Sequence, residues 1–243
     1  MADLALSNHL IDEYLKYKFQ DDYNPNTIRK LFKFIQSFAL RNDSNWMNDP
    51  SIPIQLESDP LIEIIDTCSD DDMVQASVLK LMLVDTLLRT SYINLNITND
   101  FEKLKQKYGA RYPNAIDKDK AQKHIKALLS DAHYVIITDG YIGTSRKWDD
   151  NKILIADIVP NNNIDLTIVG FNKENNIGVI DSSSKAELRT IIPNLSDVKG
   201  KILPQNIHDR YIETDKLRIL ISGGLEHLSL SSDKDFTYIV ELR

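Results

Sequence analysis

The pair His208 and Arg210 has the residue types best suited to phosphate chemistry in this sequence. If the segment from Ile207 to Asp215 is an extended strand, these two side chains share one face and Asp209 points to the other. A guanidinium offers a planar fork of donors that keeps its charge, and an imidazole can act as nucleophile or proton carrier near neutral pH. A partly exposed strand with a charged outer face has the same pattern, so the segment alone leaves both interpretations open.

Two residues follow a predicted buried strand at a position that favours ligand binding. Asp139 and Tyr141 come directly after the apolar run Tyr134 to Thr138. Ligands of open α/β sheets bind outside the carboxyl ends of the strands, and this turn would lie at such an end. The alternative is that Asp139 and Gly140 only turn the chain and cap the next segment.

A third segment, formed by Ser222, Gly223 and Gly224, follows another apolar strand. Two glycines in succession let the backbone approach a ligand closely and expose N–H groups to an anion. A tight turn at the end of a strand has the same composition. The three segments together therefore predict a phosphate site more strongly than any one of them.

His208, Arg210 and Asp215 together resemble the His-x-Lys-x4-Asp signature of the phospholipase D superfamily, with arginine in place of lysine. Where that superfamily carries Gly-Ser-x-Asn, this chain has Ser222-Gly-Gly-Leu225. The segment Thr138 to Ile142 is similar to the Asp-Pro-Tyr-(Ile/Leu) of many relatives. The resemblance spans about Ala132 to Arg243 and is nearest to the degenerate phospholipase D-like C-terminal domain of MIT-domain proteins and bacterial relatives.

The resemblance implies roles for three residues. In active members the histidine is the nucleophile, so His208 would carry the phosphoryl group, Arg210 would bind the phosphate and Asp215 would be the supporting carboxylate. Active members use two copies of the motif and no metal or cofactor. This chain has one copy, so activity would require a homodimer that pairs His208 with its symmetry mate. For His227 two interpretations stay open, a stand-in for the proton donor or a solvent-facing side chain on its turn, and its position on the turn favours the second.

Two function hypotheses from different classes follow. The replaced lysine and the missing Ser and Asn favour a non-catalytic phospholipase D-like module that binds a phosphate-containing ligand, nucleic acid or a protein partner. The alternative is a dimeric, metal-independent phosphodiesterase or nuclease with His208 as nucleophile. Family analogy places either function in a bacterial anti-phage or mobile-element system.

Charge is distributed unevenly along the chain. Between Asn42 and Leu79 there is no lysine or arginine. We expect the acidic residues of this segment to lie on a solvated surface or to contact a protein partner. The following basic segment interleaves its cations with Tyr108 and Tyr112, a pattern that can hold a polyanion by phosphate contact and base stacking, or can form a solvated helix face. The residues expected to contact nucleic acid are Lys103, Lys105, Lys107 and Arg111.

The periodicity of apolar residues predicts an α+β chain in two parts. Spacings of three and four residues predict helices over 10–19, 28–38 and 75–92, and three prolines predict a loop over 49–60. From residue 117 onward, helix and strand patterns alternate. The prediction is an all-α domain over 1–115 followed by an α/β phospholipase D-like domain with a mixed sheet over 116–243.

Composition excludes several classes of protein. The 243 residues are 42% hydrophobic and 27% charged, which is typical of a globular chain rather than a disordered one. A single cysteine excludes an internal disulfide and a cysteine-rich zinc site, and we expect no metal and no cofactor. With no apolar run of membrane-spanning length and no signal peptide, the expected location is the cytoplasm. The net charge of −7 argues against indiscriminate coating of nucleic acid.

Overall fold

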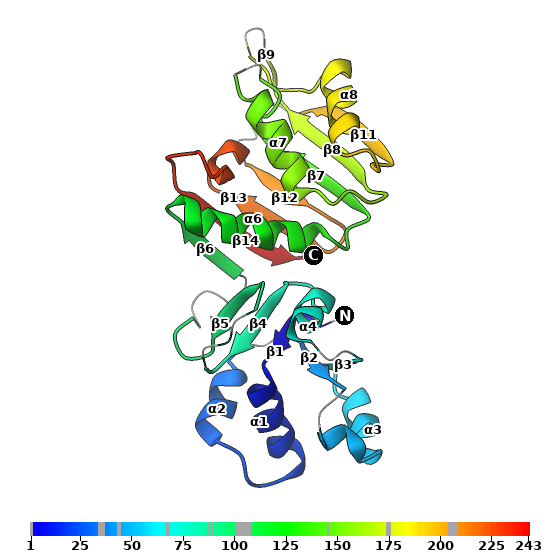
Figure 1. Ribbon diagram of the computed structural model, residues 1–243, viewed down its shortest axis with the longest axis vertical. Helices are drawn as coiled ribbons and strands as arrows, with labels where there is room; N and C mark the ends of the chain where they lie inside the picture. Colours follow the sequence, from blue (N-terminus) through cyan, green and yellow to red (C-terminus); the bar gives the residue numbers. More distant parts are fainter. Residues whose placement is uncertain are drawn as a thin grey trace. The chain divides into compact units, whose positions relative to one another are not determined.

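The chain folds into two compact units, Met1–Gln106 and Lys107–Arg243, each with its own sheet (Figure 1). The computed structural model describes residues 2–33, 37–42, 45–66, 69–86, 88, 90–100, 108–144, 146–173, 176–203 and 209–243. The strand Tyr108–Tyr112 lies before the boundary expected after residue 115, yet it pairs within the sheet of the second unit.

The first unit is an α/β structure, so the expected all-α domain is wrong. Its five-stranded sheet has the order β3-β2-β1-β4-β5, and every neighbouring pair is parallel. Parallel strands need crossover connections, and helices supply those from β1 to β2, from β2 to β3 and from β3 to β4. The elements are β1 (Leu4–Leu6), α1 (Asn8–Phe19), α2 (Pro25–Leu31), β2 (Phe38–Arg41), η1 (Asn45–Asn48), α3 (Ser51–Glu57), β3 (Ile62–Ile65), α4 (Asp70–Ala76), β4 (Leu81–Val84) and β5 (Ile93–Asn96).

The error has a physical reason in the strands themselves. All four residues of β2 and all four of β4 are buried, because strands covered on both faces form continuous apolar runs without alternation. Such runs also satisfy a helical spacing, so the predicted helices over 28–38 and 75–92 extended into β2 and β4. The predicted loop over 49–60 in fact contains α3. Pro53 does not interrupt this helix, because it lies in the first helical turn, where the missing N–H has no hydrogen-bond partner to lose.

A buried tyrosine fastens α1 to the segment before β3. The Tyr14 hydroxyl donates to Asp59 Oδ2 over 2.7 Å, and Lys18 Nζ lies 2.7 Å from the same oxygen. Burial alone would raise the pKa of the Asp59 carboxyl. The hydrogen bonds from Lys18, the Leu61 amide and Tyr14 outweigh burial and hold this pKa below its ordinary value.

Removing the Tyr14 hydroxyl should therefore destabilise the first unit. We expect Tyr14→Phe to lower the free energy of unfolding by about 1–2 kcal/mol at neutral pH, the usual range for a hydrogen bond to a charged group. Because the folded-state pKa of Asp59 is depressed, this stabilisation is present above the unfolded pKa and is lost as pH falls through the folded one. Urea unfolding at neutral and at acidic pH measures the difference; an equal cost in acid would contradict the expectation.

The second unit has a mixed seven-stranded sheet of order β11-β8-β7-β12-β13-β14-β6. Strands β7, β8 and β11 are parallel to one another, and the remaining pairs are antiparallel. The elements are β6 (Tyr108–Tyr112), α6 (Ala115–Leu129), β7 (Tyr134–Thr138), α7 (Trp148–Ile158), β8 (Asp165–Gly170), β9 (Asn172–Lys173), β10 (Asn176–Ile177), α8 (Ser182–Ile191), β11 (Asp197–Ile202), β12 (Tyr211–Glu213), β13 (Leu217–Ile221), η2 (Leu225–Leu228) and β14 (Phe236–Leu242).

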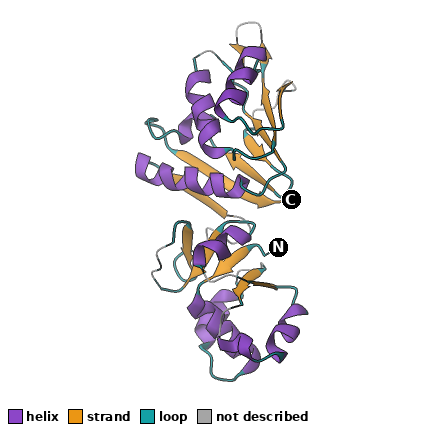
Figure 2. Cartoon of the chain, turned by 45° about the vertical axis from the view of Figure 1, so that its right-hand side comes forward, coloured by secondary structure: helices purple, strands orange, loops and turns teal. Residues whose placement is uncertain are grey.

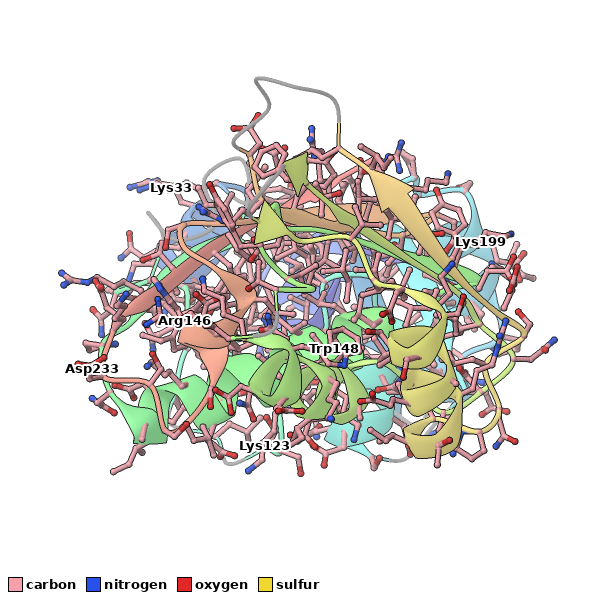
Figure 3. The ribbon with its side chains drawn as sticks, turned by 90° about the horizontal axis from the view of Figure 1, so that it is seen from above. Lys33, Lys123, Arg146, Trp148, Lys199 and Asp233 are labelled. Atoms are coloured by element: carbon pink, nitrogen blue, oxygen red, sulfur yellow. The ribbon has the colours of Figure 1, made fainter. Side chains whose placement is uncertain are left out.

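Helices α6, α7 and α8 cover one face of this sheet (Figure 2). Buried residues alternate with partly exposed ones along β13, as expected for a sheet with one covered face. Seen from above, Lys123 lies on the side of α6 away from the sheet, and Trp148 lies toward α8 (Figure 3), where its indole nitrogen donates to Glu187 over 3.2 Å. The core of the unit therefore lies between the helices and the sheet.

The helices that the structure describes are all too short or too polar to cross a lipid bilayer.

Candidate functional site

The sheet of the second unit brings Asp139 and Arg210 together. Strands β7 and β12 are antiparallel, with Thr138 opposite Tyr211, so the carboxyl end of β7 meets the beginning of β12. Asp139 follows Thr138 and Arg210 precedes Tyr211. As a result, Asp139 Oδ1 lies 3.5 Å from Arg210 Nε.

Asp139 is the buried anchor of this region, with 1% of its surface exposed. Its Oδ1 accepts a hydrogen bond from the Tyr141 amide over 3.0 Å, and its Oδ2 accepts one from the Leu225 amide over 2.9 Å. One carboxylate therefore joins the turn after β7, the start of η2 and the Arg210 guanidinium. Both of its oxygens are occupied by protein donors, so Asp139 positions its neighbours rather than offering a free ligand atom.

Three further ionisable side chains belong to the same region. Lys147 Nζ forms an ion pair with Glu226 and lies 5.9 Å from the centre of the Tyr141 ring. His227 Nε2 lies 3.9 Å from Glu226 Oε1. We call Asp139, Lys147, Arg210, Glu226 and His227 the carboxyl-edge cluster.

The environment of the cluster fixes the charge of two members. Burial lowers the pKa of His227; Glu226 opposes this, while Lys234, Lys147 and Arg210 act in the same direction as burial, and the net shift is downward. For Glu226, burial alone would raise the pKa, but the bond from Lys147 outweighs it and the net shift is again downward. At neutral pH the imidazole is therefore neutral and the carboxylate is charged.

Two polar atoms of the cluster have unused hydrogen-bonding capacity. Within the described part of the chain, Arg210 Nε has no hydrogen-bond acceptor, although Asp139 lies 3.5 Å away. Glu226 Oε2 likewise has no donor among those residues. Buried polar atoms are rarely left in this state unless a ligand or ordered water completes them.

The glycine pair after β13 makes room for two cluster side chains. A Cβ on Gly223 would lie 2.2 Å from His227 Nδ1, and one on Gly224 would lie 2.0 Å from Glu226 Oε2. Ser222 is exposed, and its hydroxyl accepts a hydrogen bond from the Thr237 amide over 3.2 Å. Glycine at both positions therefore leaves the space that the His227 and Glu226 side chains occupy.

The structure does not bring Asp215 to this cluster. Asp215 lies in the turn after β12, at the opposite end of that strand from Arg210. It accepts hydrogen bonds from the His133 amide over 3.1 Å and from the ring Nδ1 over 2.9 Å. His208, the expected nucleophile, lies outside the described residues.

The expected nucleic-acid contacts are only partly described. Lys103, Lys105 and Lys107 fall outside the described residues, and Arg111 on β6 pairs with Asp235 over 2.7 Å. The interleaved tyrosines are buried, and the hydroxyls of Tyr108 and Tyr112 lie 2.6 Å apart. These two rings therefore have no free face on which a base could stack.

Sequence reasoning missed several charged contacts because the partners are distant along the chain. Lys147 and Glu226 had no motif to mark them. In the first unit, His9 Nδ1 lies 2.5 Å from Asp85 Oδ2, where the neighbouring strands β1 and β4 end. The contact depends on the parallel pairing of those strands, which the predicted all-α domain did not include. Among the described residues, no group of three His, Cys, Asp or Glu side chains could hold a metal ion.

Comparison with known proteins adds little to this geometry. No protein-family model and no curated protein matches the sequence. Among solved structures, the chain is similar to polyphosphate kinase from Porphyromonas gingivalis, with a TM-score of 0.31 and 8% sequence identity. The match covers 56% of this chain and 23% of the kinase, and it assigns neither a family nor a function.

Proposed function

We propose that the second unit binds a phosphate-containing ligand at the carboxyl-edge cluster and does not turn it over. The observation that carries the proposal is Arg210, whose guanidinium sits beside a buried carboxylate while its Nε lacks a hydrogen-bond acceptor among the described residues. A guanidinium held in this way can direct its remaining donors to phosphate oxygens as a planar fork.

The neighbouring charges favour an anion. Lys147, Arg210 and Lys234 each contribute to lowering the His227 pKa, which places three cations within electrostatic reach of that imidazole. The side chain of Arg210 is 30% exposed and that of Lys147 is 36% exposed, so a ligand can reach both. A bound phosphate would accept hydrogen bonds from both cations and would raise the His227 pKa toward its ordinary value.

The same contacts argue against turnover within the described part of the site. The neutral imidazole of His227 lies beside Glu226, which is engaged by Lys147. Asp215, the carboxylate that the resemblance assigns to support catalysis, bonds to His133 at the far end of β12. Nucleophilic catalysis needs a nucleophile that a neighbouring group orients and activates. These contacts do not provide such a pair, so they support binding without turnover.

Binding of phosphate is tested with two arginine variants. We expect inorganic phosphate and a nucleoside monophosphate to raise the pKa of His227 in an NMR titration of the full chain. Arg210→Gln should weaken this binding by about tenfold or more, the size expected for loss of a charge-assisted bond. Arg218→Gln is the matched control, because Arg218 packs on the Tyr211 ring and pairs with Glu213. Equal effects of the two variants would contradict the proposal.

Asp215→Ala tests whether the motif or the sheet edge defines the site. Burial alone would raise the pKa of Asp215, but the hydrogen bonds from His133 outweigh it, so the pKa is lowered in the folded protein. The stability that this pair contributes is therefore lost only as pH falls through the folded-state pKa of Asp215. Because the His133 side chain is 85% exposed, the pair should contribute less than about 1 kcal/mol. Phosphate affinity should remain within about twofold of the unmodified protein, since Asp215 lies at the far end of β12. Abolished phosphate binding in Asp215→Ala would instead place the ligand at the His133 end of the sheet.

Turnover is tested with an aryl phosphodiester and with single- and double-stranded DNA and RNA in excess EDTA. We expect none. Turnover that persists in EDTA and disappears in His208→Ala would replace this proposal with the dimeric phosphodiesterase, and light scattering would then have to show the homodimer. A role in a bacterial anti-phage or mobile-element system stays a prediction of the resemblance.

A further inference from the structure

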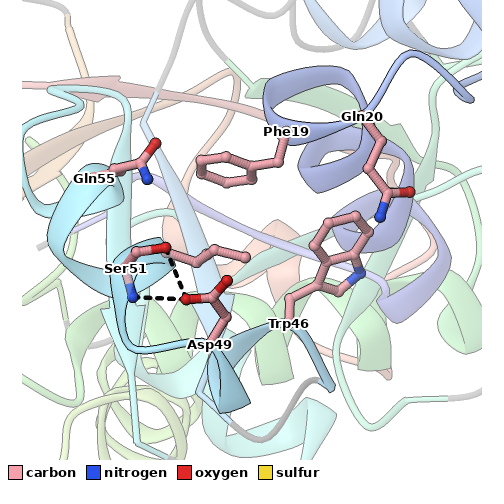
Figure 4. A pocket seen from close by; sticks show the side chains of 7 residues that line it. Phe19, Gln20, Trp46, Asp49, Ser51 and Gln55 are labelled. Atoms are coloured by element: carbon pink, nitrogen blue, oxygen red, sulfur yellow. Dashed lines mark hydrogen bonds between the residues drawn. The ribbon is translucent and has the colours of Figure 1, made fainter.

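A pocket of about 500 Å³ opens in the first unit between the end of α1, η1 and the start of α3. Phe19, Trp46 and Asp49 surround the same space from different sides (Figure 4). The buried side chain of Ile52 and two glutamine amides complete the lining. None of these residues takes part in the carboxyl-edge cluster.

Two aromatic rings form the apolar part of the pocket. The centroids of the Phe19 and Trp46 rings are 6.5 Å apart, and the ring planes are inclined by 38°. Both side chains are half-buried and line the pocket, so a ligand there would contact the two rings. The face of an aromatic ring attracts a cation, and indole does so most strongly.

A fixed carboxylate supplies the opposite charge. Asp49 Oδ1 accepts hydrogen bonds from the Ser51 amide over 2.9 Å and from the Ser51 hydroxyl over 2.7 Å (Figure 4). These bonds lower the pKa of Asp49, so the group is a carboxylate at neutral pH. Among the described residues that line the pocket, Asp49 alone carries a charge.

The wider surroundings have the same sign. The sequence has no lysine or arginine between Asn42 and Leu79. On the neighbouring helix α1, Lys16 lies 3.5 Å from Glu13, and Lys18 lies 2.7 Å from Asp59. These two cations of α1 are therefore paired with carboxylates of their own, and Asp49 is the charged side chain that lines the pocket.

We propose that this pocket binds an organic cation, an alkylammonium or guanidinium group held over the Trp46 and Phe19 rings with Asp49 as its counter-charge. The Asp49 carboxylate would repel an anion, and a neutral arene would gain nothing from its charge. The chemistry is shared by a free amine and by a lysine or arginine side chain of a polypeptide. The proposal is independent of the phosphate site.

Tryptophan fluorescence tests the proposal in the full chain. The protein has two tryptophans, so Trp148→Phe leaves Trp46 as the only indole reporter. We expect benzylammonium to change Trp46 emission in a saturable manner, with a dissociation constant on the order of millimolar. Benzyl alcohol, the neutral counterpart, should bind about fivefold more weakly or not at all. Saturation-transfer NMR on the unmodified protein repeats the comparison without the Trp148 substitution.

Two matched acid variants locate the counter-charge. An asparagine side chain can still accept the Ser51 hydrogen bonds, so Asp49→Asn removes the charge and keeps the start of α3; it should weaken benzylammonium binding about fivefold. Asp66→Asn makes the same change in net charge at an exposed residue outside the pocket and should have less than about a twofold effect. Equal binding of benzyl alcohol, an unaffected Asp49→Asn variant, or the absence of a saturable response would each overturn the proposal.

The source of the cation is distinguished by a second titration. A capped Gly-Lys-Gly peptide that binds more tightly than benzylammonium, and that loses binding in Asp49→Asn, would assign the pocket to a polypeptide side chain. Tighter binding of benzylammonium would assign it to a small amine. Failure of both probes in the unmodified protein would reject the cation site while leaving the phosphate proposal untouched.

Discussion

Substitution of Gly178 with alanine is expected to destabilise the second unit by about 3 kcal/mol or more, the upper range for overpacking in a dense interior. A Cβ on Gly178 would lie 2.0 Å from the carbonyl oxygen of Gly140 and 3.2 Å from the Phe171 nitrogen. Both are main-chain atoms that cannot rotate away. The amide of Gly178 also donates to the Phe171 carbonyl over 2.7 Å, which fixes the close approach.

The close approach of the Gly178 backbone to Gly140 and Phe171 helps to position the candidate site. Gly140 follows Asp139 directly, and the Gly143 amide donates to the Gly178 carbonyl over 3.0 Å. A shift at Gly178 would therefore displace the turn that Asp139 anchors. We expect Gly178→Ala to weaken phosphate binding as well as folding.

Gly109→Ala provides the matched control for Gly178→Ala. A Cβ on Gly109 would meet the Ile239 side chain at 3.3 Å and the Tyr238 carbonyl at 3.7 Å, which small adjustments accommodate. We expect a cost below about 1 kcal/mol. Urea unfolding followed by hydrogen exchange of peptides from the second unit measures both; similar costs for the two variants would show that the backbones at Gly178 can separate easily.

The elements of the second unit were predictable because its sheet has one covered face. Residues of β14 alternate between buried and partly exposed positions from Phe236 to Glu241, and the polar residues Thr237 and Glu241 mark this alternation in the sequence. The start of α8 was visible too: the run Ser182 to Ser184 marks it, although the capping side chain is Asp181, which accepts from the Ser184 amide over 2.8 Å. Local patterns suffice where a face is exposed.

The first unit could not be predicted in this way. Its strands β1, β2 and β4 are short and fully buried, and the run Leu81–Val84 carries no polar position to reveal its period. The residue before β4 is Lys80, whose φ of 50° lies in the left-handed region, a conformation that lysine rarely adopts. No local rule predicts that turn, and the periodicity was extended through it as a helix.

The candidate site was half predictable for a related reason. Asp139 follows a predicted strand, and the rule that ligands bind at carboxyl ends of strands is local. Arg210 was predicted inside a strand over 207–215, whereas β12 begins one residue after it. The rest of the cluster depends on where η2 and the beginning of α7 pack, which spacing does not encode. Asp215 was grouped with Arg210 because both occur in one motif, yet the intervening strand β12 separates them.

Asp139→Ala is the substitution in the site with the largest expected effect. It removes the acceptor for the Tyr141 and Leu225 amides and the anion beside Arg210, leaving a guanidinium without its buried partner. Because Arg210 is 30% exposed, water can solvate its guanidinium, and the main cost is that of two amides left without an acceptor, about 1–3 kcal/mol each. We expect a loss of this size in the free energy of unfolding, measured in urea, and loss of phosphate binding under conditions where the variant is still folded.

Asp139→Asn separates the charge of this residue from its shape. The amide keeps one acceptor and the same volume, so it should cost less stability than Asp139→Ala, yet it removes the anion that holds the Arg210 guanidinium in place. Phosphate binding should therefore weaken in Asp139→Asn while the unit stays folded. If this variant bound phosphate as the unmodified protein does, while Asp215→Ala did not, the ligand would have to sit at the His133 end of the sheet. The carboxyl-edge cluster would then be a structural network that joins β7, β12 and η2.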